Sequence, residues 1–263
     1  MREGGMELTF WGSRGSVPVT GKEYERYGGA TACVRILAGN EEIYLDAGSG
    51  IVRSVPERDT NLSLLLTQLH LDHVQGLPFF VALGEKERRI ALYAEGRSGY
   101  SAREALDRLF SPPFWPARLK DYPARIAFLE PEPLFTIGDV QIRTMSSCHP
   151  GGSTIYKLTY NGRSFVYATD FEHTEEKIRE LIAFSKDTDL LIYDGQYTSE
   201  DYEQKRGYGH STPFVGQQIA RGAHVGRLVI THHDPRYTDE YLMQIEQTHP
   251  GLHYIKDGEV LLL

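Results

Sequence analysis

Several apolar runs of this chain end in histidine or aspartate, and this pattern restricts its possible folds more than any other feature. Residues 62–67 are nearly continuously apolar, which predicts a strand buried on both faces, and the sequence Gln-Leu-His-Leu-Asp-His follows at 68–73. Four more ligand-type residues end or follow expected strands: Asp46, His149, Asp170 and His232. Structural histidines do not require such an arrangement, so we expect these side chains to share one site at the edge of a sheet.

The expected elements are mostly strands in the first part of the chain, and they alternate between strand and helix later. Strands are expected at 8–11, 32–37, 42–45, 62–67, 140–143, 153–159, 164–168, 190–193, 227–230 and 260–263. Helices are expected at 174–185, 213–223 and 238–247. This order predicts a layered sandwich with its helices on the outside.

Residues 84–133 differ in character from the rest of the chain. A charged, helix-favouring stretch at 101–109 leads into Ser-Pro-Pro-Phe-Trp-Pro at 111–116, which cannot form a regular element. The segment is either a packed surface loop or a lid or dimer contact, since aromatic residues and prolines on a rigid loop suit recognition.

The chain has 263 residues and a formal net charge of −8, which works against broad non-specific binding to nucleic acid. The charge does not exclude an anionic substrate, because bound metal cations dominate their local field. Two cysteines, Cys33 and Cys148, are too few for a disulfide framework and indicate a reducing, cytoplasmic location. We expect neither a signal peptide nor a membrane-spanning segment, because no apolar stretch of about 18 residues is visible.

Imidazole and carboxylate groups are natural ligands for zinc, iron and manganese, and the clusters above supply both. In order and context, these clusters resemble the metallo-β-lactamase superfamily. The segments at 10–18, 27–29, 45–48, 149–152, 167–170 and 232–235 resemble its phosphodiesterase branch, which includes tRNA 3′-processing endonucleases and phosphoribosyl cyclic phosphodiesterases. The resemblance implies an α/β fold, a four-layer αββα sandwich of two mixed β-sheets with outer helices. It also implies a single domain over 1–263, with a lid or interface insertion at about 84–133.

The resemblance further implies one or two divalent metal ions, zinc first, with manganese or iron as alternatives. Six residues would bind them: His70, Asp72, His73, His149, Asp170 and His232. The first ion would take the two histidines His70 and His149, the second would take Asp72, His73 and His232, and Asp170 would bridge them. Asp46 would orient a ligand histidine through a hydrogen bond.

Gln68 stands where the family has the first histidine of its motif. An amide oxygen is a weaker zinc ligand than a neutral imidazole, so the first site loses a strong third donor. Three outcomes remain open. Gln68 ligates through its oxygen in a weakened two-metal site, the second site fills alone and still supports hydrolysis, or catalysis is lost while binding is kept.

Two residues are candidates for catalysis. Asp72 can orient the attacking water and accept its proton. His210 lies in a Gly-His-Ser-Thr segment that resembles one in the tRNA-processing branch, whose histidine faces the scissile phosphate. His210 is therefore the candidate general acid, unless it merely precedes a capped helix. Asp194 either hydrogen-bonds a ligand histidine or makes a turn.

The leading prediction is a metal-dependent hydrolase, namely a phosphodiesterase acting on a small-molecule or nucleotide-type phosphodiester. The tRNA-processing enzymes carry a long Gly/Pro-rich arm between the bridging aspartate and the last histidine, whereas compact elements join Asp170 to His232 here. Together with the acidic charge, this predicts no large nucleic acid and no membrane among the partners, while a homodimer stays open. The alternatives are a catalytically weakened metal- or ligand-binding sensor, motivated by Gln68, and a thioester or lactone hydrolase of the same fold.

Overall fold

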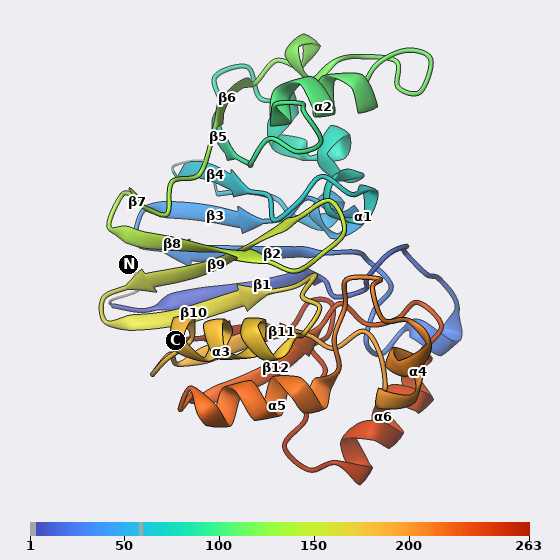
Figure 1. Ribbon diagram of the computed structural model, residues 1–263. Coiled ribbons are helices and arrows are strands. Elements are labelled where there is room, and N and C mark those ends of the chain that lie inside the picture. Colours follow the sequence, from blue (N-terminus) through green and yellow to red (C-terminus); the bar gives the residue numbers. More distant parts are fainter. Residues whose placement is uncertain (1–3, 58–59) are drawn as a thin grey trace.

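Apolar side chains on both faces of the early strands build the first of two mixed β-sheets. The computed structural model describes residues 4–57 and 60–263, with the two sheets packed face to face (Figure 1). The strands of the first sheet are β1 (Met6–Gly12), β2 (Cys33–Ala38), β3 (Glu41–Leu45), β4 (Asn61–Leu65), β5 (Arg89–Tyr93), β6 (Arg125–Leu129) and β13 (Val260–Leu262). Their order is β13-β1-β2-β3-β4-β5-β6. The pairs from β13 to β3 are antiparallel, and those from β3 to β6 are parallel.

The second sheet has the order β12-β11-β10-β9-β8-β7. Its strands are β7 (Leu134–Ile137), β8 (Val140–Ser147), β9 (Ser153–Tyr160), β10 (Arg163–Ala168), β11 (Leu190–Asp194) and β12 (Arg227–Thr231). A hairpin turn at Asn161-Gly162 joins β9 to β10, and both residues have the positive φ that such a turn requires. The strands β10, β11 and β12 are parallel, so their carboxyl ends lie at one edge of the sheet.

The helices begin where the sequence offers a capping side chain. They are α1 (Leu71–Val74), α2 (Ala102–Leu109), α3 (Glu175–Phe184), α4 (Ser199–Gln204), α5 (Pro213–Gly222) and α6 (Asp239–Thr248). Short 3₁₀ helices occupy Lys22–Tyr24, Ser49–Arg53, Leu77–Phe79, Val81–Gly84 and Leu119–Asp121. From α2 to α6, each helix follows a residue whose hydroxyl accepts a backbone N–H of the first turn: Ser101, Thr174, Thr198, Thr212 and Thr238.

Buried apolar side chains separate the molecule into four layers. Between the sheets, Phe10 and Leu65 of the first sheet pack in one cluster with Leu158 and Tyr167 of the second. Behind the first sheet, a second cluster includes residues of β4, β5 and α2. Behind the second sheet, a third cluster joins residues of β10 and β11 to α3, α5 and α6. The expected αββα sandwich is therefore confirmed (Figure 1).

The segment 84–133 contains more regular structure than its sequence indicated. It supplies β5 and β6, which extend the first sheet by two strands, and also α2. The exposed residues Arg89 and Arg125 begin the two strands and lie opposite one another in register, and only four apolar residues follow each of them. The Pro-rich stretch packs as a loop, with Trp115 against Phe110. The single domain with a lid or interface insertion here stays a prediction.

Within the described parts of the chain, no helix is long and apolar enough to cross a membrane.

Candidate metal centre

Three strand-end residues adopt a backbone conformation that turns the chain sharply as it leaves the sheet. Asp46 after β3, Asp170 after β10 and His232 after β12 have φ values of 62°, 54° and 61°. Non-glycine residues seldom adopt positive φ, and such strain gathers at functional sites. These turns place the side chains of three different strands around one point between the ends of the two sheets.

His73 is held by a buried network that fixes its orientation. Its Nδ1 lies 2.9 Å from Oδ2 of Asp46. The carboxylate of Asp46 also accepts the backbone N–H of Thr67 at 2.8 Å and the hydroxyl of Tyr167 at 3.2 Å. With Nδ1–H donated to Asp46, the Nε2 lone pair of His73 faces the other candidate ligands. The structure thus places Asp46 where an orienting residue was expected.

His232 is oriented in the same manner by a residue that the sequence did not single out. Its Nδ1 lies 2.8 Å from Oε1 of Gln196, so Nε2 faces inward. That Nε2 atom lies 3.3 Å from Oδ2 of Asp72 and 3.6 Å from Oδ2 of Asp170. The rings of His73 and His232 stack with their centroids 5.5 Å apart.

The donor atoms of this half of the cluster suit a divalent cation. Nε2 of His73 lies 3.1 Å from Oδ2 of Asp170 and 3.4 Å from Oδ2 of Asp72, yet it is buried and makes no hydrogen bond. Ligand atoms of Asp72, His73 and His232 lie within 4.8 Å of one another. Two imidazole nitrogens and two carboxylate oxygens form a donor set that zinc, manganese and iron accept. The residues present therefore fit a metal ion.

In the metal-free chain, the carboxylates and imidazoles of this cluster stabilise one another's charged forms. Burial raises the pKa of the Asp72 and Asp170 carboxyls, but the adjacent His73 and His232 imidazoles outweigh it and hold both pKa values well below the usual range. Burial lowers the pKa of both imidazoles, but the Asp170 carboxylate outweighs it. The pKa of His73 therefore lies well above its ordinary value, and that of His232 rises to about 9. A metal ion must displace these protons to bind.

His70 and His149 form the other half of the cluster. Nε2 of His149 lies 3.2 Å from Nδ1 of His70 and 3.6 Å from Oδ1 of Asp170, while its Nδ1 lies 2.9 Å from the carbonyl oxygen of Gly209. Burial lowers the pKa of both imidazoles, so they are neutral donors at pH 7. His70 is exposed, whereas the candidate ligands Asp72, His73, Asp170 and His232 are buried. The structure thus brings His70 and His149 together with Asp170, at the mouth of the site.

Gln68 precedes His70 by two residues in the sequence, and it is buried, with 3% of its surface exposed. Neither its Oε1 nor its Nε2 makes a hydrogen bond. Leaving a buried amide without hydrogen-bond partners costs about 1–3 kcal/mol of folding free energy. Gln68 is therefore favourable at this position only if a group outside the chain supplies such a partner. The three outcomes stated for Gln68 remain open on this geometry.

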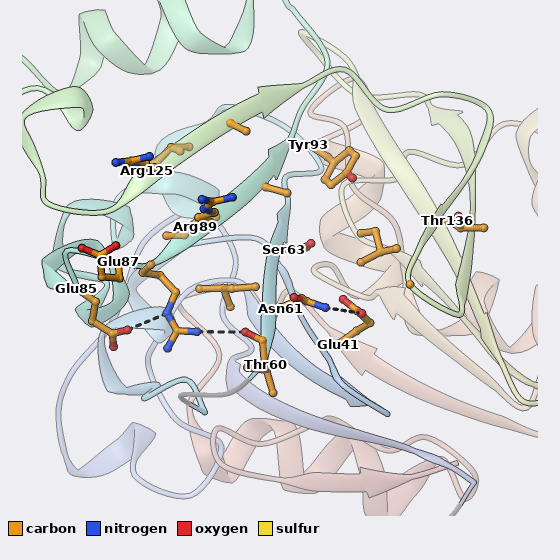
Figure 2. A pocket seen from close by; sticks show the side chains of 18 residues that line it. Glu41, Thr60, Asn61, Ser63, Glu85, Glu87, Arg89, Tyr93, Arg125 and Thr136 are labelled. Atoms are coloured by element: carbon orange, nitrogen blue, oxygen red, sulfur yellow. Dashed lines mark hydrogen bonds and ion pairs between the residues drawn. The ribbon is translucent and has the colours of Figure 1, made fainter.

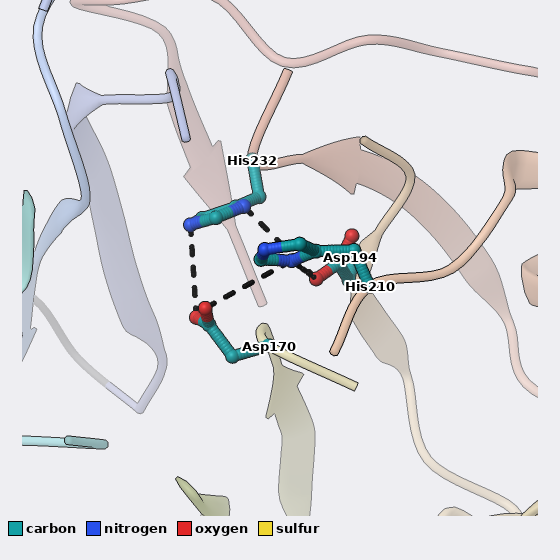
Figure 3. A group of neighbouring side chains, drawn as sticks. All are labelled: Asp170, Asp194, His210 and His232. Carbon is teal, nitrogen blue, oxygen red and sulfur yellow. Dashed lines mark hydrogen bonds and ion pairs between the residues drawn. The ribbon is translucent and has the colours of Figure 1, made fainter. Parts of the chain in front are cut away.

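His210 and Asp194 form a pair beside the carboxylate of Asp170, and Figure 3 shows these residues with His232. Nδ1 of His210 lies 2.9 Å from Oδ2 of Asp194 and 3.9 Å from Oδ1 of Asp170. Asp194 also accepts the backbone N–H of Gln196 at 3.0 Å, and it lies 4.0 Å from Nδ1 of His232. Asp194 therefore accepts a hydrogen bond from the candidate general acid His210. Ligand atoms of Asp194 and His210 also lie within 4.8 Å of those of Asp170 and His232, so these four residues form a second group that could hold a metal ion.

A loop between β1 and β2 closes the site from the other side. The backbone N–H of Ser16 donates to Oδ2 of Asp72 at 2.7 Å, and the hydroxyl of Ser16 accepts from Nε2 of Gln196 at 3.1 Å. Gly15 must be glycine here, because a Cβ atom would collide with the ring of His232. Sequence reasoning missed Ser16 and Gln196, although the Gly-rich loop and the strand-end segment around Asp194 were the signals that could have found them.

The cluster opens into a cavity of 630 Å³ lined by His70, Asp72, His149, Asp170 and His210 together with apolar side chains. A larger cavity of 1220 Å³ lies elsewhere, over β4, β5 and β6 (Figure 2). Some of its polar side chains pair with one another, as where Arg88 donates to Glu85 and Asn61 donates to Glu41. The smaller cavity is therefore the candidate site, because the ligand-type side chains converge there.

Comparison with known proteins identifies the family of this chain. Residues 42–233 match the family described as a beta-lactamase superfamily domain. A curated relative, the ribonuclease Z of Haloarcula marismortui, is 23% identical, with 98% of this chain and 94% of the relative covered. Two solved structures share the fold. The metallo-beta-lactamase fold protein YhfI of Bacillus subtilis has a TM-score of 0.75 at 20% identity, covering 99% of this chain and 100% of that one. The short form of human tRNase Z has a TM-score of 0.67 at 18% identity, covering 97% and 98%.

One expectation about partners is wrong. The acidic charge and the missing arm predicted that no large nucleic acid is a substrate, but the curated relatives matched along nearly the whole chain are named ribonuclease Z. The physical reason is that net charge describes the whole surface. It does not describe the field at a site where metal cations neutralise phosphate charge.

Proposed function

The chain belongs to the beta-lactamase superfamily domain family, and from this premise we propose that it is a metal-dependent phosphodiesterase. The observation that carries the proposal is the convergence of His73 Nε2 and His232 Nε2 on the carboxylates of Asp72 and Asp170. The ribonuclease Z relatives support the reaction class, and they support RNA among the phosphodiesters that the chain accepts.

In this proposal, the side chains of the cluster are metal ligands or proton-transfer groups, and Asp72 is both. Asp72, His73, Asp170 and His232 would hold one divalent ion, and His70, His149 and Asp170 would hold a second one. When bound, such an ion polarises a phosphoryl oxygen and makes hydroxide available at neutral pH. Asp46 and Gln196 keep Nε2 of His73 and of His232 turned inward, as their hydrogen bonds to Nδ1 require.

Two residues would move protons. Asp72 lies on the cavity wall, where its carboxylate can orient the attacking water and take its proton. His210 lies on the same wall, held by Asp194, and it would donate a proton to the leaving oxygen. A leaving alkoxide needs that proton, because it is otherwise too basic to depart at neutral pH.

We propose zinc as the physiological metal, because buried imidazole and carboxylate donors suit it, with manganese or iron(II) as alternatives. Gln68 supports unequal occupancy, with the Asp72, His73, Asp170 and His232 site filled at lower metal concentration. We also propose a cytoplasmic location, which the free thiols of Cys33 and Cys148 support.

The test is hydrolysis of bis(p-nitrophenyl) phosphate by the purified chain loaded separately with zinc, manganese or iron(II). We expect p-nitrophenolate release with at least one metal, and its loss in Asp170→Asn. Glu175→Gln is the matched control, because that carboxylate is almost fully exposed on α3. No hydrolysis of this ester or of a dinucleotide with any metal would overturn the proposal.

Gln68 motivates a second candidate, a metal or ligand sensor without catalysis. The same experiment separates the two functions. A sensor binds metal stoichiometrically but hydrolyses no phosphodiester, and Gln68→His does not restore activity to it. Hydrolysis of a thioester or lactone but of no phosphodiester would instead identify another hydrolase of this fold.

A further inference from the structure

We infer that the substrate carries a flat, largely apolar group, such as a nucleobase or an aryl ring, close to the scissile phosphate, and that this group packs on a wall formed by α2. The inference rests on the proposed phosphodiesterase function and specifies its substrate class. It starts from the cavity that contains the metal-ligand cluster.

The 630 Å³ cavity has both polar and apolar lining residues, and those that α2 contributes are all apolar. The polar side chains are Ser16, His70, Asp72, His149, Asp170 and His210. The apolar ones are Leu69, Leu71, Ala105, Leu106 and Leu109. A phosphodiester held by metal ions at the polar residues therefore has its substituent next to aliphatic side chains. Burial of an apolar group there is favourable by roughly 25 cal/mol per Å².

The apolar wall belongs mainly to one face of α2. Ala105 and Leu109 are four residues apart, so they project from the same side of the helix. Leu106, between them, is buried in the core behind the first sheet and anchors the helix there. From the opposite rim, Leu71 stands between His70 and Asp72 in sequence and is 59% exposed. This exposed leucine lines the same cavity, where it is available for contact with a substrate.

The wall is fixed in place by contacts at both ends of the helix. The N-terminus has a capping box, in which Ser101 Oγ accepts the Glu104 N–H and Glu104 accepts the Ser101 N–H. Beyond the C-terminus, the ring of Trp115 packs edge-on against Phe79 with centroids 5.1 Å apart, and its Nε1 donates to Tyr122 at 3.1 Å. The helix is therefore a packed surface against which a ring can be positioned.

The lining of the cavity does not favour a second phosphate at this wall. Among the described residues that line it, none is lysine or arginine. Arg97, in the same insertion, is engaged elsewhere, because its Nη2 lies 2.9 Å from Glu95 and donates to Thr154 at 2.9 Å. Burying a phosphate charge without a partner is costly. A diester with an uncharged substituent is therefore preferred over a diphosphate.

The test compares three substrates that share one leaving group. These are thymidine 5′-(p-nitrophenyl phosphate), phenyl p-nitrophenyl phosphate and methyl p-nitrophenyl phosphate. The measured quantity is a ratio: kcat/KM for the thymidine or the phenyl ester, divided by kcat/KM for the methyl ester. Because each variant is compared by the same ratio, differences in the intrinsic reactivity of the esters cancel. In Leu109→Ala we expect this ratio to fall about tenfold, since a lost aliphatic contact typically changes discrimination by that amount or more. A fall confined to the thymidine or the phenyl ester identifies a nucleobase or an aryl ring, respectively.

Two further variants keep the test decisive. Leu71→Ala removes an exposed side chain, so it folds even if Leu109→Ala does not, and it should lower the same ratio. Leu134→Ala is the control, because that leucine is 53% exposed on β7 and does not line the cavity. An equal fall in kcat/KM for all three esters would place the p-nitrophenyl ring of the leaving group on the wall. An unchanged kcat/KM for every ester, within twofold in both cavity variants, would overturn this inference alone. No hydrolysis of any ester by the metal-loaded protein would overturn the proposed function and this inference with it.

Discussion

The side chain of Gln196 joins His232 to Ser16, because its Oε1 accepts from Nδ1 of His232 at 2.8 Å and its Nε2 donates to Oγ of Ser16 at 3.1 Å. The backbone N–H of Ser16 then donates to Oδ2 of Asp72 at 2.7 Å. Two candidate ligands from distant parts of the chain are thus held by one amide and one loop residue. Hydrogen bonds of this kind fix the tautomer and orientation of a ligand histidine.

Gln196→Leu should weaken metal binding by about 10–100-fold, because Nδ1 of His232 then loses the acceptor that keeps Nε2 inward. Competition with a chromophoric zinc chelator measures the affinity directly, without reference to activity. Gln218→Leu is a matched control, since Gln218 is exposed on α5. Equal zinc affinity in Gln196→Leu and in the unaltered protein would show that this amide does not position His232.

Gln68→His should let the chain retain a second zinc ion during dialysis against a weak chelator. Imidazole is a stronger zinc donor than an amide oxygen, and the substitution also removes a buried amide without partners. Elemental analysis should give about one zinc per chain before the change and about two after it. The exposed Gln204 provides the control Gln204→His, which adds a histidine away from the site. Two tightly held ions in the unaltered protein would contradict the unequal occupancy proposed here.

Metal binding should tighten as pH rises from about 6.5 to about 9. The pKa of His232 in the folded, metal-free chain is raised from 6.5 to about 9, because the Asp170 carboxylate outweighs burial. The stabilisation by the charged imidazole is thus complete below pH 6.5 and is lost as pH rises through 9. Without metal, the midpoint of thermal unfolding should fall across this window, while zinc affinity should rise. Calorimetry in buffers of different ionisation enthalpy should detect proton release on binding, and its absence would exclude protonated ligand histidines.

His210→Ala should slow hydrolysis of a dinucleotide much more than that of bis(p-nitrophenyl) phosphate. An alkoxide leaving group needs a general acid, whose contribution is typically about 100–10,000-fold, whereas p-nitrophenolate leaves without one. The ratio of the two kcat values is the measurement, and zinc content is determined alongside it. His224→Ala is the control, since that side chain is 78% exposed. An equal fall with both substrates would assign His210 to metal or substrate binding instead.

The sequence was sufficient for the fold and for the strand ends that carry the site. Asp46, Asp170 and His232 follow strands whose apolar character is plain, so their shared position at a sheet edge could be predicted. β5 and β6 were not predicted, because each consists of one arginine and a run of only four apolar residues, and so short a run does not by its pattern distinguish a strand from a buried helix segment. Whether such a segment forms a strand depends on its pairing with a neighbouring strand, and that pairing cannot be read from a single sequence.

The supporting residues of the site were harder to find than the candidate ligands. Gln196 and Ser16 are ordinary polar residues in turns, and only the three-dimensional path of the chain brings them to His232 and Asp72. The apolar wall of the cavity was missed for the same reason. Leu109 belongs to an insertion whose sequence resembles a surface helix, and its contact with the cavity arises from how α2 packs behind the first sheet.

The central claim is that Asp72, His73, Asp170 and His232 hold a divalent ion, and counting zinc per chain tests it most directly. The unaltered protein, loaded with zinc and dialysed, should retain at least about one ion per chain, and His232→Ala should retain markedly less. An unaltered protein that retains no metal, or a His232→Ala variant that retains as much as the unaltered protein, would contradict the claim.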